Sequence, residues 1–141
     1  MAERIEQILK TETALRAWTQ EIRDRWQLVP PLPNKEGNKE VKHIAFICDG
    51  NRRASIKRNI SPPFLGHLAG IETVMCIDRA ARKSWGINTC TYWLWSTDNW
   101  ARGPEQAGFM SAIARSYLEN EKLLGELFQD EVRVIHLGNK Q

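Results

Sequence analysis

Residues 43–53, HIAFICDGNRR, are the most informative segment of this chain. The first six of them form a short, nearly all-apolar run, which is typical of a β-strand buried on both faces. A polar cluster follows it without a gap. Because strands buried on both faces occur mainly in parallel sheets covered by helices, the segment predicts an α/β protein with polar side chains at a strand end.

Helical and strand-like patterns alternate after this segment. Apolar residues at three- and four-residue steps indicate helices, and runs of β-branched and aromatic residues indicate strands. The alternation predicts a parallel sheet flanked by helices and truncated after its third strand. The expected elements are a helix over 66–85 stopped by Gly86, a strand over 89–95, a helix from Pro104 to about Leu127, and a strand over 132–137 ended by Gly138.

The region before residue 41 has a different character. One helical face recurs from Ile5 to Trp26 and ends before Pro30; we interpret it as a packing helix, with a partner-binding or membrane-surface helix as the alternative. Residues 30–40 are polar and contain Pro and Gly, so they predict a linker. The expected organisation is a helix and linker over 1–40, followed by one α/β region over 41–141. The apolar face consists of Ile5, Ile8, Leu9, Leu15, Trp18, Ile22 and Trp26.

Composition narrows the classes of function. A net charge of +3 over 141 residues is too mild to indicate nucleic-acid binding, although it suits an anionic ligand held by a few arginines. The three cysteines have no disulfide or zinc spacing. We find no signal-peptide pattern and no apolar run of the roughly 20 residues that a membrane span needs. A cytoplasmic protein is expected.

Two polar clusters follow the first two predicted strands, at 49–53 and 96–102. Ligands of open parallel sheets bind outside the carboxyl ends of the strands, so the clusters are expected to share one cleft. A carboxylate at a strand end can hold Mg²⁺, and backbone N–H groups at a helix start favour an anion. Arginine binds phosphate oxygens in a bidentate way. The combination suits a diphosphate, although Asp49-Gly50-Asn51 alone is also compatible with an ordinary turn.

Three blocks together, HIAFICDGNRR, FLGHLAG and YWLWSTDNWARGP, closely resemble the cis-prenyltransferases of the undecaprenyl diphosphate synthase type. In that family the blocks are similar to HIAFIMDGNRRWA, GHKAG and YAFSTENWKRP. The resemblance covers about residues 41–138 and implies the N-terminal half of such an enzyme. It implies condensation of isopentenyl diphosphate onto an allylic diphosphate, with Mg²⁺ and formation of a cis double bond, to make a polyprenyl diphosphate.

The resemblance also implies roles for individual residues. Asp49 matches the catalytic residue that binds metal and diphosphate, and Asn99 matches the residue that helps to remove the proton. An amide is a poor base, so Asn99 is better interpreted as orienting a proton acceptor such as diphosphate or water. His67 could instead be a structural cap or core contact, and Trp100 could be purely structural. The implied substrate-binding residues are Gly50, Asn51, Arg52, Arg53, His67, Ser96, Thr97, Asp98, Trp100 and Arg102.

The sequence departs from the family in several places. Pro63 stands where the family has an arginine that contacts diphosphate, and Arg58 is a candidate replacement. Ala54 replaces an aromatic residue, while Trp95 and Asp98 are conservative changes. The chain stops at Gln141, without the family's later half. A fragment or split subunit of a dimeric enzyme is therefore expected, with peripheral membrane contact through its product. The alternative is a non-catalytic module that binds an allylic diphosphate or a partner subunit.

Overall fold

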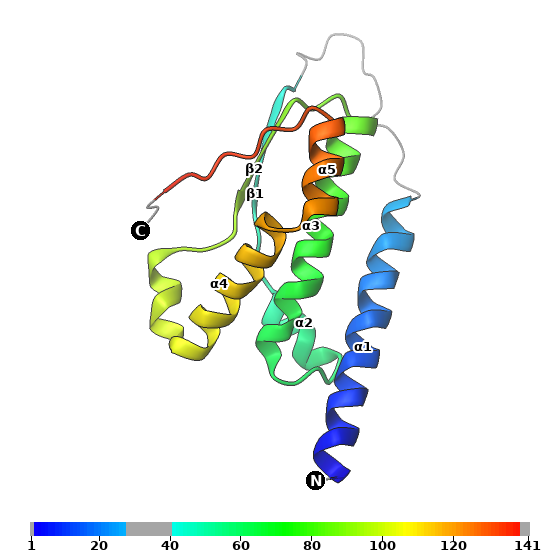
Figure 1. Ribbon diagram of the computed structural model, residues 1–141, viewed down its shortest axis with the longest axis vertical. Helices are drawn as coiled ribbons and strands as arrows, with labels where there is room; N and C mark the ends of the chain where they lie inside the picture. Colours follow the sequence, from blue (N-terminus) through cyan, green and yellow to red (C-terminus); the bar gives the residue numbers. More distant parts are fainter. Residues whose placement is uncertain (1, 28–40, 139–141) are drawn as a thin grey trace. The chain divides into compact units, whose positions relative to one another are not determined.

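The computed structural model describes residues 2–27 and 41–138, so the linker predicted over 30–40 lies outside the described residues. The chain forms two compact units, Met1–Thr97 and Asp98–Gln141. Among the described residues, the first unit contains a small parallel sheet and the helices around it, and the second contains two α-helices and most of a 3₁₀ helix (Figure 1). None of the helices in these described ranges combines the length and the apolar character that crossing a membrane requires.

The sheet of the first unit consists of β1 (His43–Ile47) and β2 (Thr89–Trp93), which pair in parallel. The register places Ile47 opposite Trp93, and the N–H of Cys48 donates to the carbonyl of Trp93 at 3.3 Å. A parallel pair needs a crossover connection, which here contains the long helix α3 (Gly66–Ser84). The predicted parallel sheet flanked by helices is therefore confirmed.

The prediction that β1 is buried on both faces is wrong for the described structure. Side chains along β1 alternate between exposed and half-buried, and Ile47 is 81% exposed. On the covered face, the rings of Phe46 and Tyr92 stack with centroids 5.2 Å apart, and burial raises the pKa of Tyr92. An apolar run allows burial on both faces, but the number of layers that cover a sheet depends on the rest of the fold.

Helix α3 supplies most of the core of the first unit. Its buried residues are small, which lets neighbouring backbones approach closely. The helix ends as predicted at Gly86, whose φ of 65° lies in the left-handed region that favours glycine. The N–H of Ile87 then donates to the carbonyl of Ala81 at 3.0 Å. The buried apolar residues of this unit are Ile60, Ala69, Cys76, Ala80, Ala81 and Ile87.

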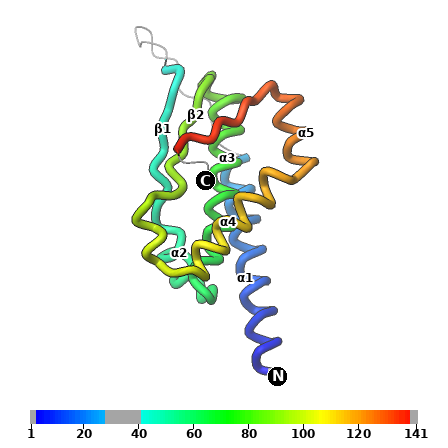
Figure 2. The backbone as a smooth tube through the Cα atoms, turned by 60° about the vertical axis from the view of Figure 1, so that its left-hand side comes forward, coloured from blue at the N-terminus to red at the C-terminus, as the bar shows by residue number. Residues whose placement is uncertain are grey.

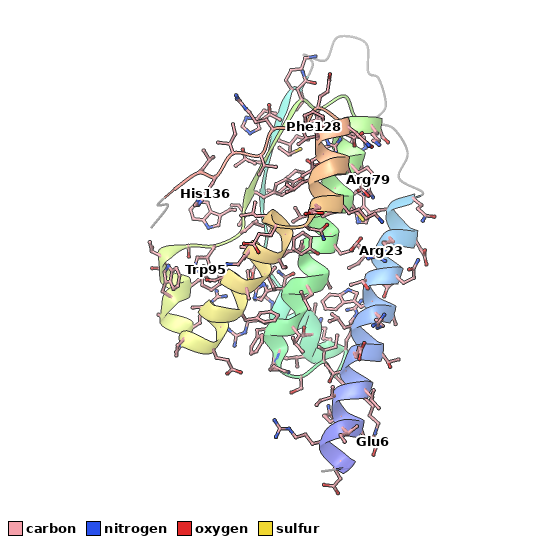
Figure 3. The ribbon with its side chains drawn as sticks, in the orientation of Figure 1. Glu6, Arg23, Arg79, Trp95, Phe128 and His136 are labelled. Atoms are coloured by element: carbon pink, nitrogen blue, oxygen red, sulfur yellow. The ribbon has the colours of Figure 1, made fainter. Side chains whose placement is uncertain are left out.

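Helix α1 (Ala2–Gln27) lies alongside α3, as both views show (Figures 1 and 2). Near its C-terminal end, Trp26 contacts Trp85 with ring centroids 6.1 Å apart. The predicted packing face is confirmed only in part, because Ile5, Ile8 and Leu9 are each more than half exposed. These residues lie on the end of α1 that extends past α2, where Figure 3 labels Glu6. A periodic pattern identifies the face of a helix but not how much of its length a partner covers.

A charged contact joins α1 to α3. The guanidinium of Arg23 donates to both carboxylate oxygens of Glu72, at 2.8 and 2.9 Å (Arg23 is labelled in Figure 3). These hydrogen bonds hold the pKa of Glu72 below its ordinary value of 4.5, although partial burial opposes the shift. A carboxyl whose pKa is lower in the folded protein stabilises the fold above its unfolded pKa. This stabilisation is lost as the pH falls from about 4.5 through the folded-state pKa.

Replacing Glu72 with glutamine is therefore expected to make the stability of the protein depend less on pH in the acid range. The melting temperature of the wild-type protein should fall more steeply than that of Glu72→Gln between about pH 5 and pH 3. Circular dichroism melts across that range measure the difference. Glu12→Gln is the matched control, since Glu12 accepts its hydrogen bonds from Arg16 within the same helix α1. Parallel profiles for wild type and Glu72→Gln would contradict the expectation.

The second unit contains α4 (Pro104–Leu118) and α5 (Glu121–Gln129). Pro104 lies in the first turn of α4, as predicted. The prediction of a single helix from Pro104 to about Leu127 is wrong, because the helix is interrupted at Glu119 and Asn120. The side chain of Asn120 accepts a hydrogen bond from the N–H of Leu123 at 2.9 Å and so begins a new helix. Asparagine is among the preferred residues at this position.

The third predicted strand, over 132–137, is also wrong: the structure assigns these residues no strand. The N–H of Val132 instead donates to the carbonyl of Leu127 at 2.8 Å and closes the end of α5. Val134, Ile135 and Leu137 are 61%, 59% and 71% exposed. A β-strand needs a neighbouring strand to complete its hydrogen bonds, so β-forming residues cannot make one alone.

Candidate functional site

Asp49 leaves the carboxyl end of β1 and starts the polar cluster predicted from the sequence. Its carboxylate accepts hydrogen bonds from the N–H of Gly50 at 2.6 Å and from the guanidinium of Arg53 at 3.0 Å. Gly50, with φ at 89°, turns the chain into the short helix α2 (Asn51–Lys57). Both charged side chains are more than 70% exposed. An exposed ion pair contributes only about 0–1 kcal/mol, so it can exchange easily for a ligand.

The carboxyl end of β2 lies at the same edge of the sheet. Parallel pairing with Ile47 opposite Trp93 places the exits of the two strands side by side. Ser96 and Thr97 follow β2 in the first unit, just after Trp95, which Figure 3 labels. Parallel pairing therefore places the ends of both strands at one edge of the sheet, as predicted, while the meeting of the two polar clusters stays a prediction.

Asn51 and His67 form the second contact among the predicted residues. The side-chain amide of Asn51 lies 3.2 Å from the Nδ1 atom of His67, at the start of α3. Both side chains are half-buried, whereas Arg52 on the same turn of α2 is exposed. The contact ties α2 to α3, and so His67 has a structural role in addition to any contact with a ligand.

Sequence reasoning missed the residues beneath this contact. Ser55 is fully buried under the start of α3, where a side chain at Gly66 would meet its hydroxyl. The hydroxyl makes no hydrogen bond in the part of the chain that the structure describes. The one sequence signal for this contact is a spacing. Asn51 and Ser55 are four residues apart, so they lie on the same face of a helix and can both pack against Gly66.

The remaining predicted residues lie on a 3₁₀ helix, η2 (Thr97–Arg102), that crosses from the first unit into the second. Trp100 is 58% exposed, so it is not a buried packing residue. Convergence of these residues with the Asp49 cluster stays a prediction. The predicted site residues of η2 that belong to the second unit are Asp98, Asn99, Trp100 and Arg102.

Arg58 contacts the N-terminal helix. Its guanidinium lies 4.5 Å from the ring centroid of Trp18 and donates to Glu21 at 3.4 Å. A stacked cation in partial exposure is stabilised by about 0.5–1 kcal/mol. Pro63, where the family has an arginine, begins the short 3₁₀ helix η1 (Pro63–Leu65). Replacement of that arginine by Arg58 stays a prediction, and it would require Arg58 to leave α1.

The donors present fit a magnesium ion that is bound mainly through a substrate. Within residues 2–27 and 41–138, no three acidic, histidine or cysteine side chains form a metal-binding group. Mg²⁺ typically takes one or two carboxylates and completes its shell with phosphate oxygens and water. The exposed carboxylate of Asp49, at a strand end, supplies this minimum. The site is therefore suited to Mg²⁺ with a diphosphate, rather than to a closed cage made by the protein.

A parallel sheet with helices around it and a charged loop at its carboxyl edge is the arrangement of an α/β protein, and ligands of such sheets typically bind outside that edge. A sequence profile described as "Putative undecaprenyl diphosphate synthase" matches residues 47–141, about two thirds of the chain. The chain belongs to this undecaprenyl diphosphate synthase family. No solved structure is significantly similar to it.

Curated relatives agree with this assignment. The chain is 36% identical over 100 residues to an isoprenyl transferase of Treponema denticola and 35% identical over 103 residues to one of Lactobacillus johnsonii. These matches cover 71% and 73% of the chain. A chloroplastic cis-prenyltransferase 7 of Solanum lycopersicum is 31% identical over 100 residues, which is 71% of the chain and 34% of that relative. The chain spans about two fifths of the length of the two bacterial relatives, 42% and 41%.

Proposed function

We propose that this chain contributes the allylic-diphosphate site of an isoprenyl transferase. The reaction condenses isopentenyl diphosphate onto an allylic diphosphate, with a new cis double bond, to give a polyprenyl diphosphate. The observation that carries the proposal is the position of Asp49 and its basic loop at the carboxyl end of β1, in a member of this family. We further propose that the enzyme is cytoplasmic and works as a homodimer, with membrane contact through its product.

The loop after β1 suits the diphosphate leaving group. Breaking the allylic carbon–oxygen bond leaves negative charge on the diphosphate, and Arg52 and Arg53 would stabilise that charge as it grows. Arg53 now bonds Asp49, but the exposed pair is weak enough to open for a ligand. Gly50 lets the ligand approach the backbone closely. Asp49 would hold Mg²⁺, which supplies further neutralisation of the diphosphate charge.

The second half of the reaction concerns a proton. A carbon–carbon bond forms between the double bond of isopentenyl diphosphate and the allylic carbon, and one proton leaves the new product. Asn99 would orient the acceptor of that proton, which is the released diphosphate or a water. We further propose substrate contacts for Ser96 and for four residues of η2, which are Thr97, Asp98, Trp100 and Arg102.

The test is product formation. The chain is incubated with farnesyl diphosphate, labelled isopentenyl diphosphate and Mg²⁺, both alone and with the C-terminal part of the Treponema denticola relative. We expect extractable labelled polyprenyl product in at least the second mixture, and none when Mg²⁺ is chelated. Absence of product from both mixtures would overturn the proposal for this polypeptide.

A second candidate function is a binding module without turnover. The observation in its favour is that the chain spans about two fifths of the bacterial relatives' length. Calorimetry with farnesyl diphosphate and Mg²⁺ separates the two candidates when it is combined with the product assay. Binding without product in either mixture favours the module, whereas binding with product favours the enzyme.

A further inference from the structure

At one close contact between helices α2 and α3, two residues on each helix lie at matching spacing. On α2, Asn51 and Ser55 are one turn apart, and on α3, Gly66 and Gly70 are one turn apart. The two glycines have different neighbours. A Cβ atom at Gly66 would lie 2.5 Å from the backbone carbonyl oxygen of Asn51 and would also meet the hydroxyl of Ser55. Backbone cannot move aside cheaply, so Gly66 is required for the packing of the two helices.

Gly70 is different because its neighbour is the end of a side chain. A Cβ atom there would lie 2.6 Å from Nδ2, 2.7 Å from Oδ1 and 2.8 Å from Cγ of Asn51. All three atoms belong to the amide group, which can rotate away. A methyl group at position 70 would therefore displace this amide while leaving the backbones of both helices in place.

The same amide holds His67. With Nδ2 of Asn51 as the donor, Nδ1 of His67 accepts at 3.2 Å, and the ring proton of neutral His67 lies on Nε2. A hydrogen bond to one ring nitrogen fixes both the tautomer and the orientation of an imidazole. A substitution at position 70 is thus expected to alter the orientation of His67 through Asn51, although the new side chain itself contacts no ligand.

We propose that Gly70 is a positioning residue of the diphosphate site. Because Gly70 has no side chain, the amide of Asn51 can occupy the space beside it and hold the ring of His67 in its orientation. The ligand in this statement rests on the function proposed above. The arrangement of the three residues does not, so the two parts are tested separately.

The first measurement is the imidazole ¹⁵N spectrum of the full 141-residue chain, in which His43→Gln and His136→Gln assign the signal of His67. We expect Gly70→Ala to shift the Nδ1 signal of His67 and to change the melting temperature by at most about 3 °C, since alanine also favours the helix. Gly108→Ala is the matched control: a Cβ atom at this glycine of α4 would meet no described atom within 4 Å apart from the surrounding backbone of its own helix. It should leave the His67 signal unchanged.

The second measurement is calorimetry with farnesyl diphosphate and Mg²⁺. We expect Gly70→Ala to weaken binding of farnesyl diphosphate about tenfold. This is the effect of losing one hydrogen bond between the misplaced His67 ring and the charged diphosphate. Asn51→Ala should weaken binding less in the Gly70→Ala background than in the wild-type background, because Gly70→Ala has already removed the contact between Asn51 and His67. Additive losses, or a His67 signal that Gly70→Ala leaves unchanged, would overturn the proposal.

Two further outcomes also decide the question. If wild type does not bind farnesyl diphosphate, the proposed function fails, and the His67 spectrum alone decides whether Gly70 positions the ring. If Gly70→Ala does not fold, the Asn51→Ala/Gly70→Ala double variant must fold, because it lacks the displaced amide. A double variant as unstable as Gly70→Ala would overturn the proposal.

Discussion

Gly66→Ala is expected to lower the free energy of unfolding by about 3 kcal/mol, at the upper end of the cost of overpacking a close contact. The new methyl group would lie 2.5 Å from the carbonyl oxygen of Asn51 and against the hydroxyl of Ser55. Relief would require α2 and α3 to separate where His67 and Asn51 meet. Urea or thermal unfolding, followed by circular dichroism, measures the loss.

Two variants make this expectation specific. Gly108→Ala, which introduces the same methyl group into an open part of α4, should be neutral or stabilising by up to about 1 kcal/mol. Ser55→Ala combined with Gly66→Ala should restore only part of the loss, because the contact with the Asn51 carbonyl remains. A Gly66→Ala protein as stable as the wild type would show that the two helices are not packed as described.

Asp49→Asn is expected to have the largest effect on activity, reducing turnover by about 100-fold or more, as removal of a group that stabilises transition-state charge does. Asparagine can still accept the hydrogen bond from the N–H of Gly50, so the turn into α2 should remain. Only the charge that would hold Mg²⁺ and pair with Arg53 is lost. The exposed ion pair with Arg53 contributes about 0–1 kcal/mol, so stability should change little.

Asp24→Asn on α1 is the control for the change of charge, since Asp24 bonds Gln20 within the same helix and lies outside the site. Turnover is measured in the mixture that gives product with wild type. Calorimetry with farnesyl diphosphate and Mg²⁺ then shows whether the loss includes binding. If Asp49→Asn and Asp24→Asn have the same affinity and the same turnover, Asp49 does not have the proposed role.

The sequence by itself predicted the elements whose signals are local. The apolar run before Asp49, the helix stopped by Gly86 and the helix start at Pro104 are where the patterns placed them. The motifs also identified the family correctly, because three separated blocks had to agree. Local chemistry is sufficient for such features, since a stop glycine or a proline at a helix start acts through its own backbone.

Only the tertiary structure decided what depends on neighbours distant in sequence. Residues 132–137 have strand propensity but form no strand in the structure, because a strand's hydrogen bonds must come from a neighbour. The exposure of Ile47 and the contact of Arg58 with Trp18 likewise depend on which element lies opposite. The same is true of Asn51. The sequence motif identified it as a candidate site residue, but its contacts with Gly70 and His67 depend on the packing of α2 against α3.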